Sequence, residues 1–466
     1  MAWRSVAEIV SRGGVFGNRG GPSATRTPSQ AKLPLGFRVF HSPAPRSAGA
    51  YVPQFGRYNS SHPRDDLPSA NLAVPNTRPL GEILRHQADN PQIRLAHETG
   101  AGFHAAPSQR EVVVLAGLSV VVMWITALLL HRSHHLVLDY GDNEAYLSVA
   151  KAVMDWDFHQ VGIQHFMGYP YFIAVVSLLF HVPTLFALWL IAAVSALVSV
   201  WLAARLFGTV AAGYFALTNF AWLQCSFLGG SEPLALAFGL GALLAFRRDR
   251  VFLTALLGSL SVTVRPLMIF VLVGIGLVLL YRRKFGSFFV ALGTGVAIGT
   301  LYMLPLARYF GDPLLTVHNY TTRDYGGGGI VGPHGQLFGW PFHGIVAGTL
   351  AYPAPWSNLL LSFFWIGLVL AGVYMMFSSS FREYAKTYPN EVIFCGLYLL
   401  ALFSYDYLIW ARSHFMRFSI PALPFVFFAL LRFLPKDRRL FWCLSIVSAV
   451  LATLSAIGVR NVIGHP

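Results

Sequence analysis

Residues 251–281 read VFLTALLGSLSVTVRPLMIFVLVGIGLVLLY, an apolar run of 31 residues interrupted by one charge, Arg265. About 20 apolar residues are enough to cross the hydrocarbon core of a bilayer. An arginine at the centre of a bilayer costs about 2.5–3.5 kcal/mol even on a lenient insertion scale. Two short membrane-spanning helices that meet at Arg265-Pro266 would instead bring the guanidinium group to the membrane surface. The run therefore predicts a pair of helices in a membrane, with Arg265 at their turn.

The rest of the chain from Glu111 onward has the same character. The 466 residues are 55% apolar and only 12% charged, whereas a soluble domain carries about 25% charged residues. Apolar blocks of near-span length follow one another, and they cannot all be buried in one soluble core. We expect an all-α polytopic integral membrane protein with 11 to 13 transmembrane helices. The apolar blocks cover residues 112–130, 169–203, 208–223, 232–246, 251–264, 266–281, 286–306, 357–378, 391–410, 418–433 and 440–459.

The block 169–203 does not fit a simple count. Its 35 residues would form a helix of about 52 Å, which is too long for one span and short for two. His181 and Pro183 near its middle predict a break, and the basic residue Arg205 after it argues against two full crossings. We expect one half-span or surface helix in this region.

The formal net charge of +14 could suggest a nucleic-acid partner. However, the Lys and Arg residues lie in short loops between apolar blocks and in the N-terminal segment, as membrane topology requires, so nucleic-acid binding is set aside. The positive-inside rule places five basic segments in the cytoplasm: Arg205, residues 247–250, residues 282–284, Arg382 with Lys386, and residues 436–439. The outer side then carries residues 131–168, the turns at 231–233 and 265–266, the loop 307–356 and the link 411–417.

Residues 1–108 are rich in Arg, Ser, Pro and Gly without a sustained apolar period, so we expect a disordered tail before a membrane domain of residues 109–466. A targeting peptide or a start codon assigned too early would give the same composition. The three cysteines, Cys225, Cys395 and Cys443, show no metal-ligand spacing and are interpreted as small buried hydrophobic residues.

The strongest candidate for chemistry is the stretch DYGDNEAY, residues 139–146, directly after the first predicted span. In an extended loop, Asp142 and Glu144 would point the same way and could share a divalent cation such as Mg²⁺ or Mn²⁺. On a helix they would diverge by about 200°, and Asp142 would pair with Tyr146 instead. Transfer of a sugar to a hydroxyl group needs a carboxylate within about 3 Å, which removes the proton of that hydroxyl as a general base. We predict that Asp142 is the general base and that Glu144 assists it. The alternative is that these acids are solvated and cap a helix beginning near Asn143.

Arg265 and Glu232 are expected near each other at the outer surface. Arg265 could bind a phosphate group through two parallel hydrogen bonds, or could simply extend toward lipid headgroups. Glu232 follows Gly229-Gly230-Ser231 and precedes Pro233. It could pair with Arg265 or hold substrate, or it could lie in an ordinary helix start capped by Ser231.

Other outer residues could complete a site. His165 precedes Gly168-Tyr169-Pro170 at the predicted re-entry into the membrane, and Arg417 lies with Arg412 and His414 in a link whose positive charge would suit a bound anion. Zinc binding by histidines lacks a companion cysteine or a paired helix motif. The loop 307–356 has aromatic residues suited to sugar stacking and a glycine run at 326–329 that suggests a flap, although an aromatic belt at the membrane surface would look the same.

These motifs, in this order, resemble the polytopic C-type glycosyltransferase superfamily, whose members, mannosyltransferases included, use polyprenyl- or dolichyl-phosphate sugars. The resemblance covers about residues 110–435 and implies an inverting transfer. It places the catalytic aspartate on Asp142, with Asp139 as second choice, and the acidic pair that binds a cation in some branches on Asp142 and Glu144. The matching elements are residues 141–144, 168–170, 231–233, 264–266 and 417–424.

We therefore predict a membrane glycosyltransferase that moves a sugar from a polyprenyl-phosphate donor to a glycan, lipid or protein acceptor at the non-cytoplasmic face. The bacterial inner membrane is the expected location, or the ER membrane if the chain is eukaryotic. The alternatives are a lipid-linked-sugar flippase or other transporter, which should show internal repeats with paired broken helices, and a silent scaffold, which would not need acids and arginines on one side. The predicted catalytic residues are Asp142 and Glu144, and the predicted substrate-binding residues are Asp139, His165, Tyr169, Glu232, Arg265 and Arg417.

Overall fold

The computed structural model describes residues 106–130, 142–158, 163, 165–322, 338–351, 356–406 and 415–463. Within these ranges the chain is helical, and the strand-type pairing is limited to an isolated antiparallel bridge between Phe338 and Tyr405. The all-α prediction is confirmed for this part of the chain. Its helices are α4 (Gln109–Leu130), α5 (Asn143–Asp155), α6 (Gly168–Phe180), α7 (Thr184–Phe207), α8 (Thr209–Thr218), α9 (Phe220–Leu228), α10 (Glu232–Arg247), α11 (Val251–Val264), η1 (Pro266–Met268), α12 (Ile269–Tyr281), α13 (Phe285–Phe310), α14 (Leu315–Thr322), α15 (His343–Ala351), α16 (Trp356–Met375), α17 (Ser379–Thr387), α18 (Pro389–Ser404), α20 (Phe415–Phe418), α21 (Leu423–Ala429), η2 (Leu431–Phe433) and α22 (Arg438–Ile463).

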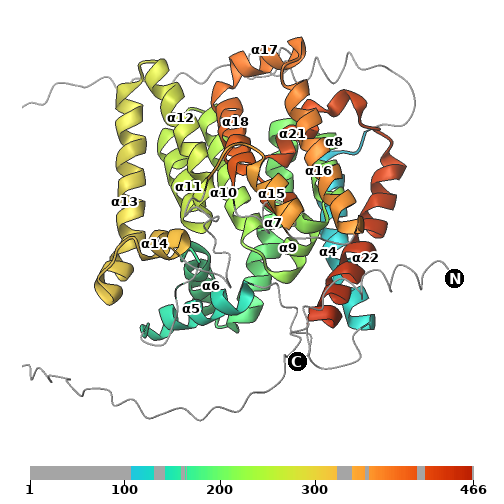
Figure 1. Cartoon of the computed structure of the whole chain (residues 1–466). Coiled ribbons are helices and arrows are strands. Elements are labelled where there is room, and N and C mark those ends of the chain that lie inside the picture. Colours follow the sequence, from blue (N-terminus) through green and yellow to red (C-terminus); the bar gives the residue numbers. More distant parts are fainter. Residues whose placement is uncertain are drawn as a thin grey trace, which may run out of the picture. The chain divides into compact units, whose positions relative to one another are not determined.

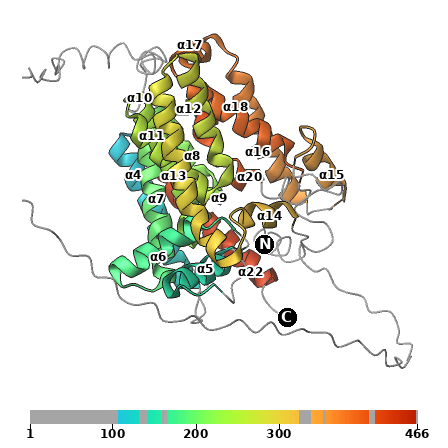
Figure 2. The same cartoon turned by 90° about the vertical axis from the view of Figure 1, so that its left-hand side faces the viewer.

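Helix α10 is central to the packing. It lies against α7 and α11, while α11 also contacts α13, and α12 contacts α18 (Figures 1 and 2). The first and last described long helices, α4 and α22, pack side by side. Most of α10 is buried, including the Glu232 that opens it. The helix therefore carries a charged group into the interior at its first residue.

The predicted turn at Arg265 is confirmed. Helix α11 ends at Val264, and Arg265 has an extended backbone with φ −141° and ψ 116° before the short helix η1. Proline disfavours helical geometry in the residue before it, so Pro266 explains why the helix stops here. The apolar run is thus divided into two helices, and Arg265 lies between them.

The predicted break in the block 169–203 is also confirmed. Helix α6 ends at Phe180, His181 takes a left-handed conformation with φ 53°, and α7 begins after Pro183. The 13 residues of α6 extend about 20 Å, which is less than the hydrocarbon core of about 30 Å. The length of α6 suits the expected half-span.

The apolar block 208–223 forms two helices and not one continuous span. Helix α8 ends at Thr218 and α9 begins at Phe220, because Asn219 is extended and its side chain caps α9 by accepting a hydrogen bond of 3.0 Å from the Trp222 N–H. Helix α9 then meets α10 at an angle of 106°. The turn between α9 and α10 consequently brings Gly229, Gly230 and Ser231 to the buried start of α10.

Three described helices are long and apolar enough to cross a membrane, and each of two bent pairs could add one span, giving up to five. The other apolar helices have 10–17 residues, among them α6, α8, α11 and α18. These lengths and compositions suit a membrane protein. The membrane location itself and the count of 11 to 13 spans remain predictions.

A buried ion-pair cluster lies at the end of α10 opposite to Glu232. Two hydrogen bonds join Arg247 to Glu391 of α18, from Nε to Oε1 at 2.5 Å and from Nη2 to Oε2 at 2.8 Å. The Glu391 side chain is fully buried, Tyr384 of α17 donates to it, and the Tyr388 ring lies 3.8 Å from the guanidinium carbon. The cluster therefore joins α10, α17 and α18, although the sequence assigned Arg247 only to a cytoplasmic loop.

Replacing Glu391 by Gln should destabilise the protein by about 3 kcal/mol, because Arg247 would be left buried without a countercharge. The matched control is Glu383→Gln on α17, whose carboxylate is 66% exposed and pairs with Lys386. Its effect should stay below about 1 kcal/mol. Thermal unfolding in detergent checks both variants. Equal unfolding midpoints for the two would contradict a stabilising role for the Arg247–Glu391 pair.

Helices α5 and α17 lie at opposite ends of the helix array (Figures 1 and 2). If the predicted topology is right, a cysteine in place of Asp155 on α5 should react with a membrane-impermeant maleimide from outside the cell. A cysteine in place of Lys386 on α17 should react only after permeabilisation. Both variants need Cys443→Ser, because Cys443 is exposed. Labelling of both positions from the same side would rule out the membrane-spanning arrangement.

Candidate active site

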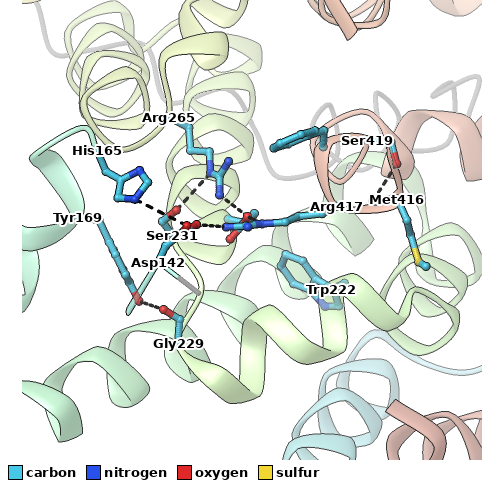
Figure 3. A network of polar contacts seen from close by, with 12 residues as sticks. Asp142, His165, Tyr169, Trp222, Gly229, Ser231, Arg265, Met416, Arg417 and Ser419 are labelled. Atoms are coloured by element: carbon cyan, nitrogen blue, oxygen red, sulfur yellow. Dashed lines mark hydrogen bonds and ion pairs between the residues drawn. The ribbon is translucent and has the colours of Figure 1, made fainter. Parts of the chain in front are cut away.

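The charged side chains of the predicted site meet around one buried carboxylate, that of Glu232. Arg265 Nη2 and Arg417 Nε both donate to Oε1 of Glu232. Arg417 Nη2 also donates to Asp142 Oδ2 at 2.7 Å, and His165 Nε2 lies 3.6 Å from Asp142 Oδ1 (Figure 3). The predicted meeting of separated acids and arginines is thus present in the structure, with the residues drawn from the start of α5, the segment before α6, the start of α10, the α11–η1 turn and α20.

The network is graded from a buried interior to a more open edge. The exposed fraction of the side chain is 2% for Glu232 and 10% for Arg417, but 22% for Asp142 and 26% for His165. Charged groups withdrawn from water persist only when they are paired, and each of these is paired. Glu232 is therefore the fixed centre, and Asp142, His165 and Arg265, whose side chain is also 22% exposed, form the accessible side.

The turn before α10 sets the position of Glu232. Gly229 has φ +94°, and a Cβ there would lie 1.7 Å from Leu188 Cδ2, so only glycine fits. A Cβ at Gly230 would lie 2.6 Å from Glu232 Oε2. The Tyr169 hydroxyl donates to the Gly229 carbonyl at 3.0 Å. Tyr169 is fully buried behind this turn and stabilises it, whereas the sequence had suggested a direct role in substrate binding.

Helix α5 sets the directions in which the Asp142 and Glu144 side chains point. Asp142 is its N-cap residue, but the carboxylate makes no capping hydrogen bond and points to Arg417 instead. Because Asn143 already begins the helix, Glu144 diverges from Asp142 and is exposed. The two carboxylates therefore diverge as a helix requires, and this geometry does not give Asp142 and Glu144 a shared cation site. The Asp142–Tyr146 pair expected for a helix is replaced by contacts of Asp142 with Arg417 and of Tyr146 with Ser231. No group of three His, Cys, Asp or Glu side chains suited to a metal occurs among the described residues.

Two polar residues were missed as site components. Ser231 was interpreted as a helix cap, yet its hydroxyl makes no cap and instead lies 3.2 Å from both Arg265 Nε and the Tyr146 hydroxyl. Asn143 is buried and donates to the Leu228 carbonyl at 2.6 Å, which joins α5 to the end of α9. Their adjacency to Glu232 and Asp142 was the available indication in the sequence.

Two buried acceptor atoms of the site have no hydrogen-bond partner within the described part of the chain: Glu232 Oε2 and Asn143 Oδ1. A buried acceptor without a partner is costly, typically by 1–3 kcal/mol. Of the other residues considered for the site, Asp139, Arg412, His414 and the glycines at 326–329 lie outside the described residues.

The cations of the site control the charge of Asp142. Burial raises the pKa of this carboxyl group, but Arg417, His165 and Arg265 together outweigh the burial and lower the pKa to about 2. Asp142 is therefore a carboxylate at any physiological pH. While it remains paired with Arg417, it is also a weak base.

Comparison with family models, curated proteins and solved structures gives no match for this chain. The interpretation of the site accordingly depends on its own geometry and on the short motifs of the sequence.

Gly229→Ala should disrupt the site, because the new methyl group meets Leu188 in a backbone conformation that alanine rarely adopts. A comparison without a clash is Gly208→Ala, since Gly208 has a similar φ of +90°, with ψ 160° where Gly229 has 31°, and nothing within 4 Å of the added Cβ. The Gly229 variant should be less stable than the Gly208 variant by about 1–3 kcal/mol in thermal unfolding. Equal stability would show that the turn tolerates a side chain.

Proposed function

We propose that this protein is a membrane glycosyltransferase that moves a sugar from a polyprenyl-phosphate donor to an acceptor hydroxyl at the non-cytoplasmic face. One observation supports the proposal above all: the Asp142 carboxylate is bonded to Arg417, which shares the buried carboxylate of Glu232 with Arg265. Apart from Asp142, two guanidinium groups and one buried carboxylate leave one positive charge. That charge matches the single negative charge of a phosphodiester-linked sugar donor.

Arg265 and Arg417 would hold the donor phosphate. Arginine binds phosphate oxygens through charge-assisted, often paired hydrogen bonds, and such donors stabilise the negative charge that develops on a leaving group. Both guanidinium groups are oriented by their contacts with Glu232, and Arg265 also by Ser231. The arginines would therefore need little rearrangement as the donor binds.

Asp142 would act as the base toward the acceptor. The acceptor oxygen attacks the anomeric carbon as its proton passes to Asp142, and the bond between that carbon and the phosphate oxygen breaks. The products are the glycoside, a protonated Asp142 and a polyprenyl phosphate dianion, so the total charge is unchanged. Attack opposite the leaving phosphate inverts the anomeric centre, as the family resemblance implies.

A lipid-linked-sugar flippase or other transporter is the second candidate. The 106° bend between α9 and α10 brings a helix N-terminus to the charge network, and broken helices of this kind line substrate sites in transporters. Such a protein would move the donor lipid across the membrane and release no glycoside. The appearance of product therefore separates the two functions.

Asp142→Asn should reduce sugar transfer by at least about 100-fold while the protein still inserts, because the amide cannot accept the acceptor proton. Membranes containing the variant are assayed against a panel of polyprenyl-phosphate sugars. The control is Asp155→Asn, the same substitution at an exposed residue of α5, which should keep wild-type transfer. Wild-type transfer by the Asp142 variant would exclude it as the base.

A further inference from the structure

We infer that Asp142 occupies the phosphate-binding position of Arg417 while no donor is bound, and that an arriving phosphate ester displaces it. This inference rests on the proposed function, which assigns the donor phosphate to Arg265 and Arg417. It adds what Asp142 does before and after that phosphate binds.

The hydrogen bonds of Arg417 provide the first argument. Its Nε is directed to Glu232, and its Nη2 to Asp142 at 2.7 Å. A phosphate that binds the guanidinium through two parallel hydrogen bonds needs the edge that Asp142 now occupies. Glu232 cannot make room, because it is almost fully buried at the start of α10. Asp142 is the partner that must leave.

Charge provides the second argument. Arg265 and Arg417 carry two positive charges, Glu232 removes one, and Asp142 removes the other in the donor-free site. A phosphodiester supplies the same single negative charge as Asp142. Holding both anions against the arginines would leave an excess negative charge in a poorly solvated site, which is unfavourable. The phosphate therefore replaces Asp142 and does not add to it.

The third argument is freedom of movement. Asp142 lies at the N-cap of α5 without a capping hydrogen bond, and its side chain is 22% exposed. The His165 ring already lies 3.6 Å away on the accessible side and can accompany the displaced carboxylate. Turning this side chain away from Arg417 therefore breaks no cap of the helix.

The exchange would couple donor binding to base strength. Among the cations, Arg417 contributes most to the low pKa of Asp142, so losing that contact raises the pKa toward the ordinary carboxyl range and makes Asp142 a better base. An acceptor hydroxyl would then be activated only after the donor phosphate is in place. We therefore expect the donor to bind before the acceptor.

The test measures binding of polyprenyl phosphate, which carries no sugar, to the full-length protein in lipid nanodiscs. Asp142→Asn removes the internal competitor, so the variant should bind at least about tenfold more tightly than wild type. Asp155→Asn should stay within about twofold of wild type, and Arg417→Gln should bind at least about tenfold more weakly. Unchanged or weaker binding by the Asp142 variant would overturn the exchange.

Two further ligands identify what the site recognises. If inorganic phosphate shows the same tightening with Asp142→Asn, the exchange is supported and the phosphate group alone is recognised. The same tightening for phosphatidylglycerol would also support it and extend recognition to ordinary lipid headgroups. If the Asn variant does not fold, Asp142→Ala carries the same expectation. In the wild-type protein, carbodiimide labelling of Asp142 should rise when polyprenyl phosphate is added, and unchanged labelling would count against displacement.

Transfer assays on the same preparations separate this inference from the proposed function. Loss of transfer by Asp142→Asn without tighter phosphate binding would overturn the exchange alone. Tighter phosphate binding with wild-type transfer would support the exchange and overturn the catalytic role of Asp142.

Discussion

The carboxylate of Glu232, buried at the first residue of α10, is the contact on which the site depends. It accepts hydrogen bonds from Arg265 and Arg417, which come from separate parts of the chain. Without a shared negative charge, two guanidinium groups in a poorly solvated interior would repel each other and leave the site. Glu232 thus makes a concentrated positive charge compatible with an apolar helical protein, and Asp142 balances the charge that Glu232 leaves.

The two ends of α10 show how a structural ion pair differs from a candidate site. Arg247 and Glu391 form a saturated pair, with two hydrogen bonds between them and further support from aromatic side chains. The network at Glu232 is open on one side, where Asp142 and His165 remain partly exposed, and it contains a buried oxygen of Glu232 without a partner among the described residues. Both clusters are buried and charged, so burial alone does not indicate function. What distinguishes the Glu232 network is its partly exposed edge and the buried acceptor without a partner among the described residues.

The sequence predicted much of this arrangement, because an isolated charge within a long apolar run is compatible with few helix arrangements. Arg265 inside an apolar run requires a turn, and Pro266 fixes where the turn occurs. Contacts between distant segments were harder to foresee. The sequence did not show that Asn219 divides the block 208–223, since an asparagine within an apolar block is equally compatible with a continuous helix. It also could not decide between extended and helical geometry at Asp142, and the start of α5 at Asn143 is what separates Glu144 from the network.

The most direct test of the central claim is a cryo-EM structure of the protein in lipid nanodiscs with a polyprenyl phosphonate sugar, whose carbon–phosphorus linkage resists cleavage. We predict that the phosphonate oxygens bind both Arg265 and Arg417, that Glu232 keeps its contacts with the two arginines, and that Asp142 turns away from Arg417 toward the anomeric carbon. Density for the phosphonate elsewhere in the protein, or a phosphonate bound while the Asp142–Arg417 pair stays intact, would contradict this interpretation of the site.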